Sequence, residues 1–326
     1  ERLIAQFQER LRTKFPDGKG NPAEPAQELY HLLVEPLEPT LEQHGVQTLI
    51  YAADNQLRYI PLAALFDGNQ WLIERFQINN VTAASLTDFA TSSRSRGFTS
   101  VLAAAYSETP APFSVGETPY RFDGLKHTID EVSVVASLGE TARTLVNREF
   151  NLTSVEANLE AHQFIHFATH AAFVDGAPEE SFILLGDEGR LSIRQINDWN
   201  LENIELIVLS ACETAVSSDF GSGEEILGFG YQIQRAGARG GVATLWLVKD
   251  QSTLPFMRFF YAHIKGGELN YAEALRAAQL SLIYGSRPRE DGTYEANDSS
   301  SPQEGVYSVY SHPHHWAPFI LIGNGL

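Results

Sequence analysis

The stretch LIVLSACETA, residues 206–215, decides the fold of this chain because it reads as a buried strand that ends at a cysteine. Its continuous run of leucine, isoleucine and valine is typical of a strand covered on both faces. Cys212 is the only cysteine among 326 residues, so it has no partner for an internal disulfide. It is therefore either a small core residue or a reactive thiol at the end of a strand.

Around this strand, short apolar runs alternate with helical patterns, which predicts an α/β fold with a mostly parallel sheet sandwiched by helices. The predicted strands after residue 96 are 100–106, 142–147, 163–169, 181–186, 204–211 and 240–248, with 315–323 closing the sheet. The predicted helices are 127–139, 152–162, 192–199 and 223–237, followed by two more. Upstream, the β-rich runs at 47–53, 57–62 and 71–81 predict a smaller N-terminal sheet region.

The chain divides into three predicted parts. Residues 1–45 are an N-terminal helical segment, which is amphipathic and fits the end of a helical repeat array. Residues 46–95 are the N-terminal sheet region, and the Ser/Arg-rich stretch at 91–97 separates it from the core at 96–326. Within the core, the polar, acidic and turn-rich residues 285–311 predict a long surface loop.

Composition excludes several classes of function. Lysine and arginine total 23 against 41 aspartate and glutamate residues, a formal net charge of −18 at pH 7, which disfavours direct binding of nucleic acid. No apolar run approaches the roughly 18 residues of a membrane span, and the N-terminal stretch lacks the apolar core of a signal peptide. With one cysteine and no such segment, we expect a cytoplasmic protein that does not bind membranes.

His170 is the candidate partner of Cys212. It ends the predicted strand QFIHFATH, and it precedes the cysteine by 42 residues. In a parallel sheet the carboxyl ends of the strands share one edge, where chemistry collects, so the two side chains can meet there. A thiol has a pKa of about 8.5, and a neighbouring imidazole is the group that makes it an efficient nucleophile. From spacing alone, a catalytic pair and a buried inert cysteine remain equally open.

Five motifs in one order resemble the CHAT family of caspase-like cysteine peptidases, which is related to separase and belongs to clan CD. The upstream run LRYIPLAALFDGNQWLIERF at 57–76 resembles the opening of the same domain, so the likeness spans about residues 46–326. The motifs are FIHFATHAAF (164–173), IVLSACETA (207–215), GFGYQIQRAGARGGVATLWLVKDQST (228–253), YAEALRAAQLSL (271–282) and HWAPFILIGNG (315–325).

The resemblance implies an endopeptidase with a catalytic dyad of His170 and Cys212. The thiolate would form an acyl-enzyme with a specific protein partner, and the imidazole would move the protons. The backbone N–H groups of Ala171 and Cys212 would hold the oxyanion. The family usually has glycine after the histidine, so Ala171 reduces the freedom of that loop.

The resemblance also suggests a basic P1 side chain, the substrate residue before the cut, read by an acid in the enzyme. Related peptidases carry such an acid two positions before the cysteine, where this chain has Ser210. The remaining candidates are Asp250, at a strand-to-helix turn, and Glu213, next to Cys212. Asp250 is equally suited to cap the helix that starts near Ser252.

Two other hypotheses remain open. In the first, the chain is a catalytically silent caspase-like module for interaction or signalling. In the second, it is a zinc hydrolase. His162, His166 and His170 would align for zinc on a helix, but their segment reads as a strand, so we expect no metal site and no cofactor. The family often occurs with tetratricopeptide (TPR) repeats or regulatory partner proteins, which predicts a protein regulator for the peptidase.

Overall fold

The structure is a computed structural model, and it describes most of the chain. The described residues are 2–12, 21–82, 97–174, 180–211, 213–214, 224–246, 248, 250–288, 294–296 and 310–326.

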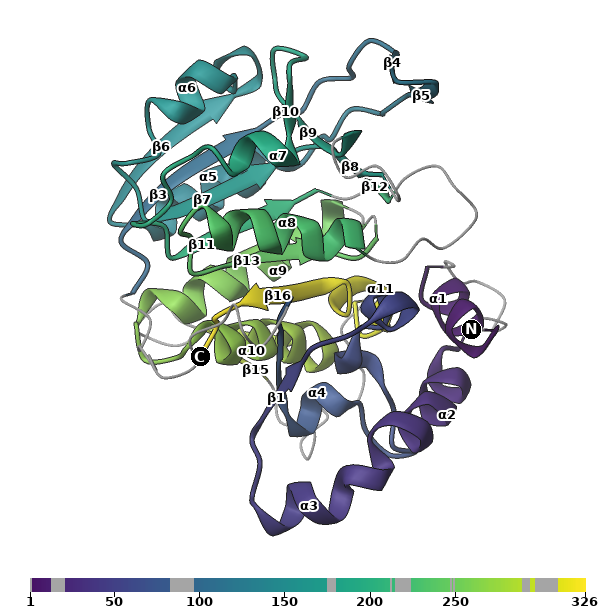
Figure 1. Cartoon of the computed structure of the whole chain (residues 1–326). Coiled ribbons are helices and arrows are strands. Elements are labelled where there is room, and N and C mark those ends of the chain that lie inside the picture. Colours follow the sequence, from purple (N-terminus) through teal and green to yellow (C-terminus); the bar gives the residue numbers. More distant parts are fainter. Residues whose placement is uncertain are drawn as a thin grey trace.

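An eight-stranded sheet runs through the molecule in the order β1-β2-β16-β13-β11-β7-β3-β6 (Figure 1). From β13 to β6 every neighbouring pair is parallel, so the carboxyl ends of these strands share one edge. This confirms the predicted mostly parallel α/β sheet. The strands are β1 (Thr48–Tyr51), β2 (Gln77–Asn80), β3 (Ser100–Ala105), β6 (Thr141–Val146), β7 (Phe164–Ala168), β11 (Leu206–Ser210), β13 (Gly240–Thr244) and β16 (Phe319–Gly323).

Helices cover both faces of this sheet, as predicted. Since side chains alternate between the faces of a strand, neighbouring residues show which helix covers which face. A side chain at Gly241 would meet Ile233 of α8, whereas His166, on the other face, contacts α5 and α9. The helices are α1 (Arg2–Arg12), α2 (Ala23–Leu33), α3 (Glu38–Gln43), α4 (Leu72–Arg75), α5 (Thr128–Leu138), α6 (Leu152–Glu156), α7 (Ile193–Ile196), α8 (Glu224–Arg235), α9 (Asp250–Lys265), α10 (Tyr271–Tyr284) and α11 (Pro313–Trp316).

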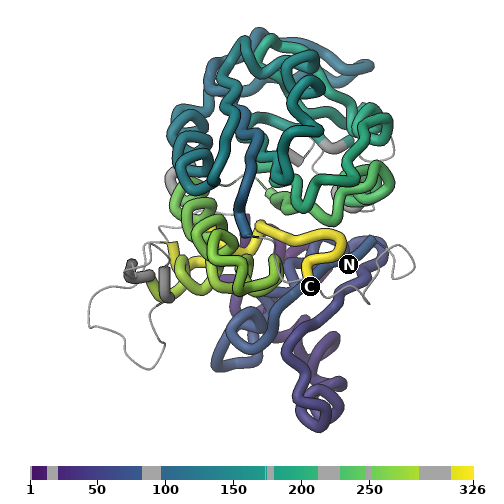
Figure 2. Tube along the Cα trace, turned by 90° about the vertical axis from the view of Figure 1, so that its left-hand side faces the viewer, coloured from purple at the N-terminus to yellow at the C-terminus, as the bar shows by residue number. Residues whose placement is uncertain are grey.

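The N-terminal sheet region joins the main sheet through β16. This strand is antiparallel to β13 and parallel to β2, so it lies inside the sheet, and the prediction that it closes the sheet is wrong. Figure 2 shows the purple and blue N-terminal part of the chain on one side of the yellow β16 and the teal part on the other. The junction is bonded, because Asn79 and Asn80 donate to the carbonyls of Gly323 and Leu321.

Two predicted strands of this region form other structures. Residues 57–62 are not a strand, because the chain there forms two 3₁₀ helices, η2 (Asn55–Tyr59) and η3 (Leu62–Ala64). Pro61 between them has no N–H to donate to a sheet. The predicted strand 71–81 is divided between α4 and β2, since the Glu74 side chain accepts from the Trp71 N–H and caps a short helix.

A second, smaller sheet lies beside the ends of β7 and β11, in the order β10-β9-β8-β12. The described part of the predicted loop 285–311 contains a two-stranded antiparallel pair. The remaining short strands are β4 (Phe113–Val115), β5 (Thr118–Tyr120), β8 (Ala171–Phe173), β9 (Phe182–Leu184), β10 (Arg190–Ser192), β12 (Glu213–Thr214), β14 (Ser286–Pro288) and β15 (Tyr294–Ala296).

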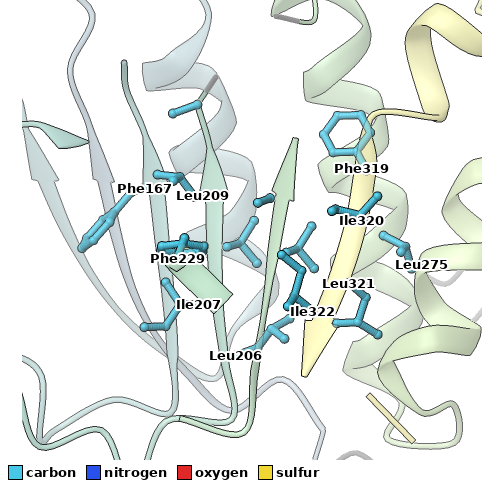
Figure 3. Packing of buried hydrophobic residues seen from close by; sticks show 14 of the residues in the cluster. Phe167, Leu206, Ile207, Leu209, Phe229, Leu275, Phe319, Ile320, Leu321 and Ile322 are labelled. Atoms are coloured by element: carbon cyan, nitrogen blue, oxygen red, sulfur yellow. The ribbon is translucent and has the colours of Figure 1, made fainter. Parts of the chain in front are cut away.

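The apolar core lies between the main sheet and its helices. Figure 3 shows how Ile207 and Leu209 of β11, Phe229 of α8 and Ile322 of β16 gather around the central strands, all of them buried. This core fixes β7 and β11, whose ends carry the candidate site. Among the described residues, no helix combines the length and apolar character of a membrane span.

Candidate active site

A small cleft that is open to solvent lies at the carboxyl edge of the parallel strands. The ends of β7, β11 and β13 contribute to it, together with the first turns of α5 and α9. Its location agrees with the general rule for open α/β sheets. Among the described residues that line it, Glu131 and His170 are the ionisable ones. The lining residues are Leu125, Thr128, Glu131, Thr169, His170, Ser210, Ala211, Thr244, Val248 and Thr253.

The two strand ends that carry the candidate dyad run side by side. Ala168 pairs with Ser210 at the ends of β7 and β11, and a few residues later Ala172 of β8 pairs with Glu213 of β12. His170 lies between Ala168 and Ala172, in the short stretch that joins β7 to β8. Cys212 lies outside the described residues, and its neighbour Ala211 is buried and lines the cleft.

Two consecutive residues fix the His170 ring. Its Nε2 lies 2.8 Å from the backbone carbonyl oxygen of Asp123, and the Phe122 ring stacks on it with centroids 4.5 Å apart and planes 20° apart. A carbonyl oxygen only accepts, so the neutral ring carries its proton at Nε2 and has its basic nitrogen at Nδ1. His170 is 6% exposed. The ring is therefore held in one orientation and one tautomer.

The turn after β7 is also fixed through its backbone. Thr169 Oγ1 donates to the carbonyl of Leu184 at 2.6 Å, and the Leu184 N–H donates to the carbonyl of His170 at 2.8 Å. Ala171 is buried in β8 and pairs with Ile183 of β9. Its φ is not positive, so alanine fits this backbone without strain, and the glycine usual in the family is not needed here.

The histidine inside β7 belongs to a different, buried network. His166 is fully buried, with Nε2 3.0 Å from Glu131 Oε1 and Nδ1 3.0 Å from the Tyr261 hydroxyl. Burial, aided by the Glu131 charge, raises the pKa of Tyr261 well above its usual range, so this hydroxyl keeps its proton. The hydroxyl can donate to Nδ1 of His166, and the N–H at Nε2 then donates to the Glu131 carboxylate. This arrangement satisfies His166 without a metal.

The three histidines considered for zinc do not align on a helix. Residues 164–168 form β7, as predicted, and His162 before it has Nδ1 2.7 Å from the Asn158 carbonyl. Within the described ranges, no group of three or more histidine, cysteine, aspartate or glutamate residues is arranged to hold a metal ion.

Of the two candidate acids for P1 recognition, Asp250 lies on an element that lines the cleft. Asp250 is the first residue of α9, one turn before Thr253, which lines the cleft. Glu213 begins β12, beside β8. The side chains of both residues lie outside what the structure describes.

The fold and the cleft together define an α/β protein with a candidate active site at the carboxyl edge of its sheet. The CHAT domain model matches residues 23–324, so the chain belongs to the CHAT domain family, as the motifs predicted. A search of curated proteins found no match.

Solved structures give distant likenesses. The Arg-specific cysteine proteinase gingipain R is 10% identical, with a TM-score of 0.48, over 98% of this chain and 73% of that one. The Saccharomyces cerevisiae separase–securin complex contains a chain 11% identical, with a TM-score of 0.48, over 81% of this chain and 14% of that one. Porphyromonas gingivalis RgpB, in a complex of its pro- and mature domains, is 8% identical with a TM-score of 0.46, over 100% of this chain and 75% of that one.

Sequence reasoning missed the residues that surround His170. Phe122 and Asp123 precede it by more than 45 residues, and Asp123 acts through a backbone carbonyl, which no residue type encodes. Glu131 was hidden by its position, because an acid in the first turn of a helix is the ordinary choice there. The alternation in LRYIPL gave no sign of η2 and η3.

Proposed function

We propose that this chain is a cysteine endopeptidase that cleaves a specific protein, with Cys212 as the nucleophile and His170 as the general acid and base. The observation that carries the proposal is the orientation of His170. Its Nε2 is bonded to the Asp123 carbonyl, so Nδ1 is the basic nitrogen of the neutral ring, and a basic imidazole nitrogen is the group that activates a thiol. Membership of the CHAT family, which resembles caspase-like peptidases, supports the same assignment.

The backbone pairing supports the meeting of the two side chains. Neighbouring strands lie about 4.8 Å apart. His170 is flanked by Ala168 and Ala172, which pair with Ser210 and Glu213, the residues on either side of positions 211 and 212. This pairing of the flanking residues supports the proposal that Cys212 and His170 meet.

The proposed reaction has two stages. The Cys212 thiolate attacks the scissile carbonyl carbon, the C–N bond breaks, and the leaving amine takes the proton that His170 holds. A water molecule then gives a proton to His170 and attacks the acyl-enzyme, which releases the carboxylate product and regenerates the thiol. We assign the oxyanion to the N–H groups of Ala171 and Cys212, because backbone donors at such a position stabilise the developing charge.

Asp250 is our first choice for an acid that recognises a basic P1 side chain, with Glu213 as the second. Residues three apart on a helix share a face, and Thr253, three residues after Asp250, lines the cleft. A carboxylate forms charge-assisted hydrogen bonds with a cationic P1 side chain, so it binds that side chain more strongly than a neutral one.

We also propose a protein regulator and a reducing compartment. Residues 1–45 would be the end of a helical TPR-like array, 46–95 the N-terminal part of the domain and 96–326 the peptidase core. A cytoplasmic location keeps a catalytic thiol reduced. The net charge of −18 favours basic protein partners and disfavours nucleic acid.

The test is labelling with an acyloxymethyl ketone that carries arginine at P1, in the presence of the candidate regulator. We expect the wild-type chain to gain one label and Cys212→Ala to gain none. Equal labelling of the two proteins would exclude Cys212 as the nucleophile. A wild-type chain that stays unlabelled while iodoacetamide still alkylates it would favour the catalytically silent interaction module.

A further inference from the structure

The β4–β5 hairpin and the residues after it form an aromatic cluster that ends on His170. The ring of Phe113 stacks with that of Tyr120 at 5.7 Å, and both lie 6.0 Å from the ring of Phe122. Phe122 is 3% exposed. It is therefore packed from behind by the hairpin and presents one face to the imidazole.

Phe122 and Asp123 constrain the imidazole in complementary directions. The Asp123 carbonyl accepts from Nε2 at 2.8 Å and so stops rotation within the ring plane, while the stacked Phe122 ring stops the imidazole from tilting out of it. A rotation of half a turn would move Nε2 away from the carbonyl. Phe122 and Asp123 thus select the ring orientation in which Nε2 donates to the Asp123 carbonyl and Nδ1 is the basic nitrogen.

The aromatic face also acts on the charge of His170. The face of a phenyl ring carries negative partial charge, so it favours a cation stacked on it over the neutral form. In the proposed function, on which this inference rests, the imidazole becomes a cation each time the thiol gives up its proton. A site with little exposure to water strengthens this interaction.

We propose that Phe122 is a positioning residue that stabilises the protonated His170 and thereby raises the population of the Cys212 thiolate. Among the described residues, the acids next to this region are Glu131 of α5, which lines the same cleft and is bonded to His166, and the exposed Asp123, whose carbonyl accepts from the imidazole. Phe122 differs from these acids because it acts without carrying a charge.

The test is the rate at which iodoacetamide alkylates Cys212 between pH 5 and 9, followed as the mass increase of the intact chain. Because Cys212 is the only cysteine, the mass increase reports this residue alone. We expect Phe122→Leu to lower the rate near pH 6 by about three- to tenfold and to change the rate at pH 9 little. Phe122→Tyr, which keeps the stacked face, should behave as wild type.

Two further variants separate the effect of the ring stacked on His170 from the effect of packing in the aromatic cluster. Phe113→Leu alters the same aromatic cluster one ring away from His170, and we expect it to keep the wild-type profile. A fluorinated phenylalanine at position 122 keeps the shape but weakens the negative face, and we expect it to lower the rate near pH 6 even if Phe122→Leu fails to fold.

The outcomes distinguish this inference from the proposed function. Equal losses in Phe113→Leu and Phe122→Leu, or a wild-type profile with the fluorinated ring, would overturn the role of Phe122 while leaving the dyad intact. His170→Ala is the reference, because it should remove the fast reaction near pH 6. A wild-type chain with the same profile as His170→Ala would overturn the dyad, and the role of Phe122 with it.

Discussion

The two histidines of the FIHFATH segment lie four residues apart and have opposite environments. His166 lies inside β7, where Tyr261 and Glu131 contact its two ring nitrogens. His170 lies just beyond the end of the strand, where it lines the cleft and is held by a backbone carbonyl and an aromatic face.

The difference between them follows from their position on the sheet. A residue in the middle of a central strand is covered by helices, so a polar side chain there must find all its partners within the core. A residue beyond the carboxyl end meets the crevice in which ligands bind. We therefore assign a structural role to His166 and propose a reactive role for His170.

The largest expected effect separates the histidines by activity. His170→Ala should lower kcat/KM for a cleaved protein substrate by at least about 10³-fold, because it removes the proposed proton carrier. The measurement is the initial rate of cleavage. His162→Ala is the matched control, because His162 lies just before β7, as His170 lies just after it, and its Nδ1 is bonded to the nearby Asn158 carbonyl. Retention of more than a tenth of the activity in His170→Ala would remove this histidine from the mechanism.

The next effect concerns recognition of the P1 side chain. Asp250→Asn should lower kcat/KM for a substrate with arginine at P1 by about 10- to 100-fold, because it removes the charge that pairs with the guanidinium. Stability should change little, since asparagine also caps helices well. The measurement compares arginine with norleucine at P1. An activity within twofold of wild type would move the assignment to Glu213.

The smallest effect separates the histidines by stability. Tyr261→Phe removes the hydroxyl at His166 Nδ1 and should lower the free energy of unfolding by about 1–3 kcal/mol, because a buried nitrogen loses its partner. We expect kcat/KM to stay within about threefold of wild type. Denaturant unfolding and initial rates are the two measurements. A large loss of activity with unchanged stability would show that the His166 network serves the reaction itself.

The parallel part of the fold could be predicted from the sequence because its strands are continuous apolar runs. Residues 163–169 and 204–211 contain β7 and β11, and their ends indicated His170 and Cys212. The N-terminal region was harder, because local interactions outweigh alternation there. Asp54 accepts from the Asn55 N–H to start η2, and Pro61 interrupts any ladder after it.

The surroundings of His170 could not be predicted for a different reason. Phe122 reads as one more aromatic residue near a turn, and only the path of the chain after β5 places it on the imidazole. Long-range contacts of this kind depend on how β5, α5 and β7 pack together. The candidate residues were therefore visible in the sequence, whereas the groups that orient them were not.

The central claim is that Cys212 and His170 act as one dyad, and a crystal structure of the chain inactivated by the P1-arginine ketone tests it most directly. We predict a covalent bond from Cys212 Sγ to the inhibitor, with His170 Nδ1 about 3 to 4 Å from the sulfur and Nε2 still bonded to the Asp123 carbonyl. A sulfur that faces the opposite edge of the sheet, or an inhibitor bound to another residue, would contradict the account.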